Sequence, residues 1–220
     1  MSELKQQTKS PAFRYVCPFL IFILLTELQR FADGKEVFFV YALKSVLTAA
    51  ALYYFFRGRL KEISGGFSFE AVIVGVVSFF VWLGLTEIIP HEKVITFNPY
   101  LCEDKFFVYA AMAIRIAGAS LVVPLMEELI WRSFLMRYLI DSNFLSINIG
   151  KYTHFSFWGT VIAFTLVHAQ WEWLAAFAVG IIYGGYVVYR KNIWGVIIAH
   201  GVTNLLLGLY VIYTGKYYYW

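Results

Sequence analysis

Two adjacent carboxylates, Glu127 and Glu128, interrupt the longest apolar stretch of this sequence. Arg132 follows Glu128 by four residues, so the two side chains meet on one face of a helix and are expected to form an ion pair. Glu127 lies about 100° further around the helix and has no such local partner. A carboxylate without a partner can accept a proton, which is what a general base must do. Glu127 is therefore the first candidate for a catalytic residue.

Two of the four histidines, His168 and His200, also lie in apolar stretches, whereas His91 and His154 lie in predicted loops. Asn204 follows His200 by four residues, so both side chains point the same way on a helix. A single histidine in such a place is often only a hydrogen-bonded packing residue. Two of them, together with an asparagine and a pair of carboxylates, favour a functional site.

These four residue types suit the hydrolysis of an amide bond by either of two mechanisms. In the first, Glu127 takes a proton from a trapped water that attacks the carbonyl carbon, while His168 helps to hold that water. His200 and Asn204 then donate hydrogen bonds to the oxyanion, worth a few kcal/mol in a dry site. In the second, His168, His200 and a glutamate hold zinc, which activates the water. The sequence contains no HExxH motif, so we favour the glutamate mechanism, expect no cofactor, and keep zinc as the alternative.

The composition is that of a membrane protein with several helices. Of the 220 residues, 60% are hydrophobic and 15% are charged, and the mean hydropathy is +0.67. This excludes a disordered chain and a small disulfide scaffold, and leaves too little polar surface for a soluble domain. The net charge of +4 is spread over short loops, so no nucleic-acid partner is expected. We predict an all-α, polytopic helical membrane bundle of about seven to eight transmembrane helices.

Apolar runs of about 20 residues, the length that crosses a bilayer core, position the candidate residues. We expect a short cytoplasmic tail at 1–11 and a single transmembrane domain at 12–220. The predicted spans cover residues 12–28, 37–56, 69–89, 106–140, 155–170, 173–189 and 193–213. The fourth span is unusually long, and Pro124 deprives the Ser120 carbonyl of its helical donor there, which predicts a kink.

Lysine and arginine counts predict how the bundle is oriented. Ten of these residues fall in one set of alternate loops and five in the other, which places the N-terminus in the cytoplasm. At a rise of about 1.5 Å per residue, Glu127 and His168 then lie about 20 Å deep and His200 about 15 Å deep. The three side chains are thus expected at a similar level in the membrane.

Other polar and aromatic residues in the spans have simpler interpretations. Glu27, Glu70 and Glu87 lie near span ends, and Lys44 is expected to extend its ammonium group to an interface. The aromatic residues 217–220 are expected to form part of an interfacial belt.

The candidate residues form three motifs that resemble those of a known family. EExxxR covers Glu127 to Arg132, FxxxH covers Phe164 to His168, and HxxxN covers His200 to Asn204. Together and in this order, they resemble the CAAX prenyl endopeptidases of the Ras-converting type and their bacterial relatives. These enzymes form the CPBP family of intramembrane proteases. The resemblance covers roughly residues 106–210.

This resemblance implies an intramembrane endopeptidase with a water-accessible cavity. It implies Glu127 as the general base, with the site completed by His168, His200 and Asn204. It also implies supporting roles for Glu128, Arg132 and Phe164. The substrate would be a peptide or a lipidated protein within the lipid bilayer, and a bacterial-type member would lie in the plasma membrane. Trp131 and Ser133 depart from the phenylalanine and glycine that many members have beside the arginine.

Two other functions are compatible with the sequence. The first is a non-catalytic membrane protein that acts in immunity or as a scaffold. The second is a proton-coupled transporter, since intramembrane glutamate and arginine can relay protons. The short chain and the lack of repeated halves count against a transporter.

Overall fold

The computed structural model describes residues 11–57, 65–66, 68–90, 92 and 98–220. All of its regular elements in these ranges are helical. The α-helices are α2 (Pro11–Gln29), α3 (Lys35–Phe56), α4 (Phe69–Ile88), α5 (Lys105–Ala117), α6 (Val123–Glu128), α7 (Met136–Tyr138), α8 (His154–Leu166), α9 (Trp173–Arg190) and α10 (Trp194–Thr214). The π-helical segments are η2 (Gly118–Val122) and η3 (Leu129–Leu135), and the 3₁₀ turns are η1 (Pro99–Leu101), η4 (Phe144–Ser146), η5 (Gln170–Glu172) and η6 (Tyr217–Tyr219).

Some residues used for the predictions lie outside the described ranges. They are nearly all of the predicted tail, the loop histidine His91, and the basic residues Lys5, Lys9, Arg59, Lys61 and Lys93.

The predicted polytopic helical bundle is confirmed. Six helical segments of the described chain are long and apolar enough to cross a membrane: residues 11–29, 35–56, 69–88, 105–138, 170–190 and 194–214. The seventh apolar helix, α8, has 13 residues, which gives a length of about 20 Å against a hydrocarbon core of about 30 Å. The predicted span 155–170 therefore ends early, at Leu166.

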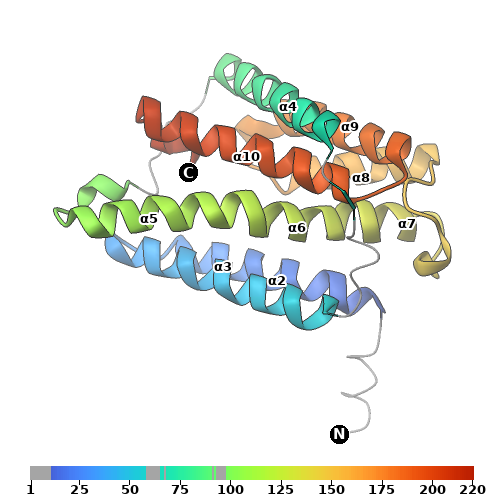
Figure 1. The fold of residues 1–220 in the computed structure, drawn as a ribbon, viewed down its shortest axis with the longest axis horizontal. Helices are drawn as coiled ribbons and strands as arrows, with labels where there is room; N and C mark the ends of the chain where they lie inside the picture. The colour runs from blue at the N-terminus through green and yellow to red at the C-terminus, as the bar shows by residue number, and fades with distance from the viewer. Residues whose placement is uncertain (1–10, 58–64, 67, 91, 93–97) are drawn as a thin grey trace, which may run out of the picture.

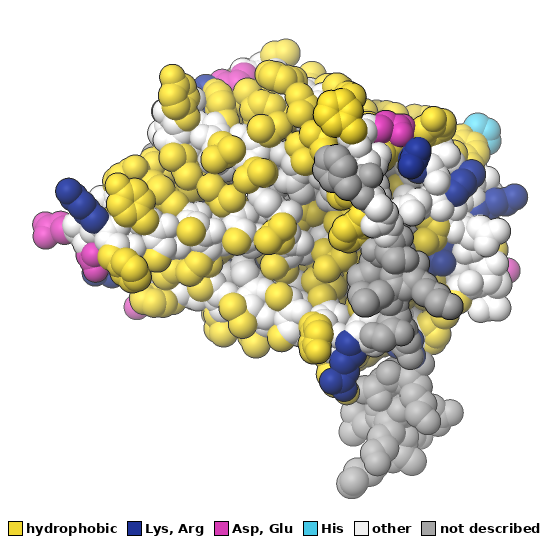
Figure 2. Space-filling view, in the orientation of Figure 1, with side chains coloured by type: hydrophobic (Ala, Val, Ile, Leu, Met, Phe, Trp, Pro, Cys, Tyr) yellow, Lys and Arg dark blue, Asp and Glu magenta, His cyan; other side chains and the backbone are white. Residues whose placement is uncertain are grey.

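The long helical run from α5 to α7 forms the centre of the bundle. In Figure 1 it crosses the middle of the view, with α2 and α3 on one side and α4, α8, α9 and α10 on the other. Helix α10 packs along α4, and α2 packs along α3. Hydrophobic side chains cover the middle of the face seen in Figure 2, and charged side chains gather toward its ends. This is the surface that a bilayer requires, and the chain is a multi-pass membrane protein.

The irregularity predicted at Pro124 is a π-helical turn. In η2, the amide of Val123 donates to the carbonyl of Gly118, five residues earlier. The Ala119 carbonyl is thereby left without its usual donor, and the residue after Val123 is a proline, which has no N–H to give. One carbonyl of the central run is free to accept a bond from another helix.

A chain of hydroxyl groups holds α10 against α4 and α9. Tyr183 donates to the hydroxyl of Thr203 at 2.8 Å, and Thr203 is 2.8 Å from the carbonyl of Gly75, to which it donates. Gly75 is needed there because a Cβ atom would lie 2.5 Å from the carbonyl oxygen of Ala199. This contact fixes the position of the helix that carries His200.

Lys44 does not reach an interface, so that expectation is wrong. Its side chain is only 4% exposed, and its ammonium group donates to the hydroxyl of Thr26 at 3.1 Å. Helices α2 and α3 pack closely enough to enclose it. The carboxylates near span ends behave as expected, since Glu27, Glu70 and Glu87 are partly exposed and paired with basic side chains.

Candidate active site

Glu128 is the centre of a fully buried ionic cluster. Its Oε1 accepts hydrogen bonds from Nη1 of Arg132 at 3.1 Å and from Nδ1 of His200 at 2.8 Å. Neither Glu128 nor Arg132 is more than 1% exposed. The guanidinium of Arg132 also lies over the rings of Phe164 (4.6 Å) and Tyr183 (5.5 Å). The predicted contact between Glu128 and Arg132 is present, and the contact with His200 adds the link to α10.

His168 lies just beyond the end of α8, where the sequence had predicted a continuing span. Its backbone amide bonds to the Thr165 carbonyl at 3.2 Å, as in a tightened last turn. The Phe164 carbonyl is then free, and Nδ1 of the His168 ring donates to it at 2.7 Å. Because a carbonyl only accepts, Nδ1 carries the proton, and Nε2 of the neutral ring keeps a free lone pair. The ring is held between Phe164 (4.6 Å) and Trp82 (5.4 Å).

Asn204 binds the carbonyl that the π-helical turn leaves free. Its Nδ2 donates to the Ala119 oxygen at 2.8 Å. Helix α10 approaches this turn closely at Gly201, where a Cβ atom would lie 2.8 Å from the Ser120 oxygen. The glycine inside the HxxxN motif thus allows Asn204 to reach the central run.

The four residues assigned to catalysis line one cavity. A cavity of about 220 Å³ is lined by Glu127, His168, His200 and Asn204 together. Oε2 of Glu127 is buried and has no hydrogen-bond partner among the described residues. The adjacent glutamates therefore have different surroundings, since Glu127 borders the cavity and Glu128 lies in the core.

The two departures from the family pattern are accommodated by η3. Trp131 is buried, and its ring packs against Phe19 at 5.3 Å and Phe164 at 6.1 Å. The hydroxyl of Ser133 accepts a hydrogen bond from Nη2 of Arg137 at 2.8 Å. Both side chains thus have packing or bonding partners beside Arg132.

Several lining residues were not predicted from the sequence. Arg115, from α5, borders the cavity, as do Tyr219 and Trp220 from the C-terminal segment. Arg115 lies ten residues inside its span, and a charged residue at that depth is a sequence signal that could have identified it. The hydroxyl of Tyr219 lies 3.1 Å from that of Thr86, near the end of α4.

In the part of the chain that the structure describes, no group of three or more histidine, cysteine, aspartate or glutamate side chains could hold a metal ion. The three-ligand zinc set considered from the sequence, namely His168, His200 and a glutamate, is therefore not assembled there.

A comparison with family models agrees with the three motifs. The model described as "Type II CAAX prenyl endopeptidase Rce1-like" matches residues 109–206, slightly under half of the chain, and this segment contains all three motifs. No curated protein and no solved structure matches the chain. On this match, the resemblance is confirmed for residues 109–206, which are similar to the CAAX protease (CPBP) family.

Proposed function

We propose that this protein is an intramembrane endopeptidase that hydrolyses peptide bonds with a water molecule activated by Glu127. One observation carries the proposal: the buried, unpartnered oxygen of Glu127 borders the same cavity as His168, His200 and Asn204. A carboxylate oxygen that has no hydrogen-bond partner and borders a cavity is available to take a proton.

The proposed reaction uses each residue once. Glu127 takes a proton from water, and the oxygen attacks the carbonyl carbon of the scissile bond. His168 accepts a hydrogen bond from that water through its free Nε2. The second N–H of the Asn204 amide and Nε2 of a protonated His200 donate to the oxyanion, each worth a few kcal/mol. Glu127 then passes its proton to the leaving nitrogen as the C–N bond breaks, which yields an acid and an amine.

Glu128 and Arg132 support this reaction without touching the substrate. Because Glu128 accepts from Nδ1 of His200, it fixes the ring orientation and leaves Nε2 for the substrate. The same carboxylate is also paired with the guanidinium of Arg132.

The proposal is tested with membranes from cells that express wild-type protein or Glu127→Gln. Comparative proteomics should find at least one membrane-associated protein that is shortened only in the wild-type cells. Peptides spanning that cleavage site are then incubated with purified protein in detergent. His168→Ala and Asn204→Ala should lose at least about 100-fold in rate, whereas the control His154→Ala, in an exposed histidine, should keep full activity.

Two results would overturn the proposal. Undiminished cleavage by Glu127→Gln would exclude this residue as the base. A phenotype that survives both Glu127→Gln and His168→Ala, with the protein still folded, would favour the non-catalytic immunity or scaffold function. We also propose that the reaction needs no zinc: elemental analysis of the active protein should find no stoichiometric metal, and one zinc per chain that is lost with activity in His168→Ala would contradict this.

A further inference from the structure

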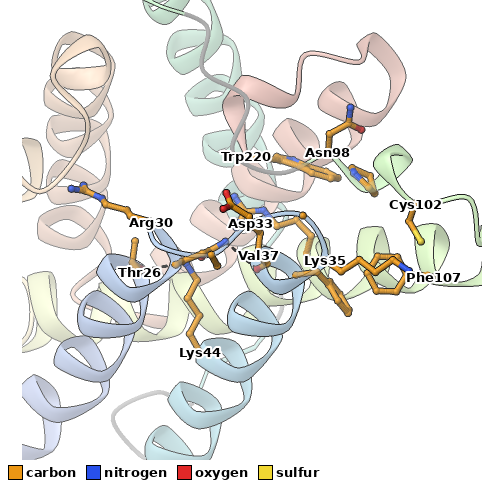
Figure 3. A pocket seen from close by; sticks show the side chains of 16 residues that line it. Thr26, Arg30, Asp33, Lys35, Val37, Lys44, Asn98, Cys102, Phe107 and Trp220 are labelled. Atoms are coloured by element: carbon orange, nitrogen blue, oxygen red, sulfur yellow. Dashed lines mark hydrogen bonds between the residues drawn. The ribbon is translucent and has the colours of Figure 1, made fainter.

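A second and larger cavity adjoins the candidate active site. Its volume is about 680 Å³, and it lies between α2, α3, α5 and the C-terminal segment. Figure 3 shows Thr26 from α2, Lys44 from α3, Phe107 from α5 and Trp220 around it. Arg115 and Trp220 line both this cavity and the one that contains Glu127. The two spaces are therefore neighbours that share a wall or an opening at Arg115.

Two intramembrane cations face this second cavity. The Nζ atom of Lys44 and the Cζ atom of Arg115 lie 5.1 Å and 4.3 Å from the centre of the same Tyr41 ring. Lys44 is almost fully buried, and the hydrogen bond of its ammonium group within the described residues goes to the neutral hydroxyl of Thr26. Nε of Arg115 is buried and has no hydrogen-bond partner in the described ranges.

The two cations lack a compensating acid. Neither Lys44 nor Arg115 forms an ion pair with any described residue. The described lining residues include four basic side chains and one acidic side chain, namely Arg30, Lys35, Lys44, Arg115 and Asp33. A buried cation is retained in a membrane at considerable cost, and such residues usually mark a path or site for a ligand. An anion entering this cavity would meet two basic side chains that form no ion pair with the described residues.

We propose that Lys44 and Arg115 bind a carboxylate of the peptide substrate. This rests on the proposed function, because Arg115, which lines both cavities, is what links the two basic side chains to the scissile bond. A peptide lying across Glu127 passes Arg115 and presents residues on one side of the cleaved bond to the second cavity. The carboxylate comes from an acidic side chain or from the free C-terminus of that peptide. Arg115 and Lys44 bind a peptide with a carboxylate at this position more tightly than one with a neutral group there.

A peptide is favoured over a lipid headgroup by the other residues that line the cavity. Gln29, Asn98 and Thr26 add neutral hydrogen-bonding side chains to the lining, and Thr26 contacts Lys44. This mixture suits a polypeptide, which brings amide groups along with its charge.

The test measures binding without turnover. Three fluorescent apolar peptides of otherwise identical sequence are prepared: a free C-terminal acid, the C-terminal amide, and that amide with one internal glutamate. Their affinities for the Glu127→Gln protein in neutral detergent are measured by anisotropy. One or both of the acidic peptides should bind about tenfold more tightly than the neutral amide, and which of the two does so identifies the source of the carboxylate.

The preference should disappear in Glu127→Gln combined with Arg115→Gln or Lys44→Gln. It should be retained with Arg115→Lys, and with the control Lys105→Gln, which removes an exposed charge from the same helix α5. A circular dichroism spectrum and a single elution peak show whether each variant is folded, and Arg115→Lys serves as the test if Arg115→Gln is not.

Equal binding of all three peptides by folded protein would overturn the inference. Displacement of the acidic peptides by phosphatidylglycerol, but not by phosphatidylcholine, would overturn it in favour of a lipid headgroup. The proposed function fails separately: if wild-type protein prefers acidic peptides but cleaves nothing, the anion site stands and the peptidase does not.

Discussion

At the scale of single residues, the two adjacent glutamates show what sequence reasoning reaches. The contact between Glu128 and Arg132 follows from their spacing on one helix. The bond from His200 to Glu128 does not, because it joins residues 72 positions apart and depends on how α10 packs. Local spacing therefore identified Glu128 as the carboxylate that pairs with arginine, and left Glu127 as the one without a local partner. It did not show which residues bind the histidine side chains.

Replacing each glutamate by glutamine should separate stability from activity. Glu128→Gln leaves the buried Arg132 without a counter-charge, so the protein should lose about 3–5 kcal/mol of stability. The buried Oε2 of Glu127 has no hydrogen-bond partner among the described residues, so Glu127→Gln should change the stability by about 1 kcal/mol or less while activity is lost. Thermal unfolding in detergent, followed by circular dichroism, compares the two. Equal destabilisation by both variants would contradict this division.

The tautomer of His168 can be observed directly. Because Nδ1 donates to the Phe164 carbonyl, the neutral ring should carry its proton on Nδ1, which is the less common form in water. Nitrogen NMR of protein labelled at histidine should show this signal in the wild type and lose it in His168→Gln. A ring protonated on Nε2 would mean that its lone pair faces away from the cavity.

At the scale of elements, hydropathy predicted the spans, but backbone irregularities were only partly predictable. Pro124 indicated that a donor was missing, yet it did not indicate that η2 would widen and offer the Ala119 carbonyl to Asn204. The early end of α8 was missed because apolar residues continue past Leu166, and its position depends on the bond that the His168 side chain makes.

Gly201→Ala should damage the site while leaving the helix intact. The added methyl group would lie 2.8 Å from the Ser120 oxygen, so α10 must move away and Asn204 loses its bond to Ala119. We expect at least about a tenfold loss of activity, since small misplacements of catalytic groups are costly.

Gly185→Ala is the matched control, because a Cβ atom there meets nothing within 4 Å. It should keep full activity and stabilise α9 by up to about 1 kcal/mol. Unchanged activity in both variants would mean that the close approach at Gly201 has no role in catalysis.

The C-terminal segment should make stability sensitive to alkaline pH. The hydrogen bond to Glu87 raises the pKa of Lys216, and burial raises the pKa of the Tyr219 hydroxyl. Both groups hold their protons more tightly in the folded state, so their contribution is complete below about pH 10, the value for unfolded chains, and is lost as the pH rises further.

Thermal unfolding midpoints measured from neutral to strongly alkaline pH check this sign. The wild type should lose more stability above about pH 10 than Glu87→Gln, which has no ion pair with Lys216 to lose. Parallel curves would show that the segment 215–220 does not depend on this contact.

At the scale of the whole molecule, the sequence predicted how many apolar helices there are but not which of them are neighbours. Lys44 and Arg115 lie 71 positions apart, and only the packing of α3 beside the central run places both against Tyr41. Lipid-facing and buried positions are equally apolar, so the pattern of the spans does not specify their arrangement.

The arrangement of the helices predicts from which side of the membrane the cavities are reached. The segment after α7 and the end of α9 lie at the end of the bundle where α2 begins, whereas the end of α10 and the C-terminus, with the cavity-lining Trp220, lie toward the other end (Figure 1). If the excess of basic loops holds the N-terminus in the cytoplasm, the cavities open toward the opposite face.

Single cysteines at exposed positions test this in sealed, right-side-out vesicles, after Cys17 and Cys102 are replaced by serine. A membrane-impermeant maleimide should label Thr214→Cys at once, and Asn143→Cys only after the vesicles are permeabilised. Asn204→Cys, inside the candidate site, should behave like Thr214→Cys, though more slowly because it is half-buried. If all three variants show the reversed pattern, the protein has the opposite orientation in the membrane. The cavities would still open at the end of the bundle that contains Thr214. Labelling of Asn204→Cys together with Asn143→Cys would instead mean that water and substrate enter from the end that contains the first residues of α2, and the path past Arg115 would have to be abandoned.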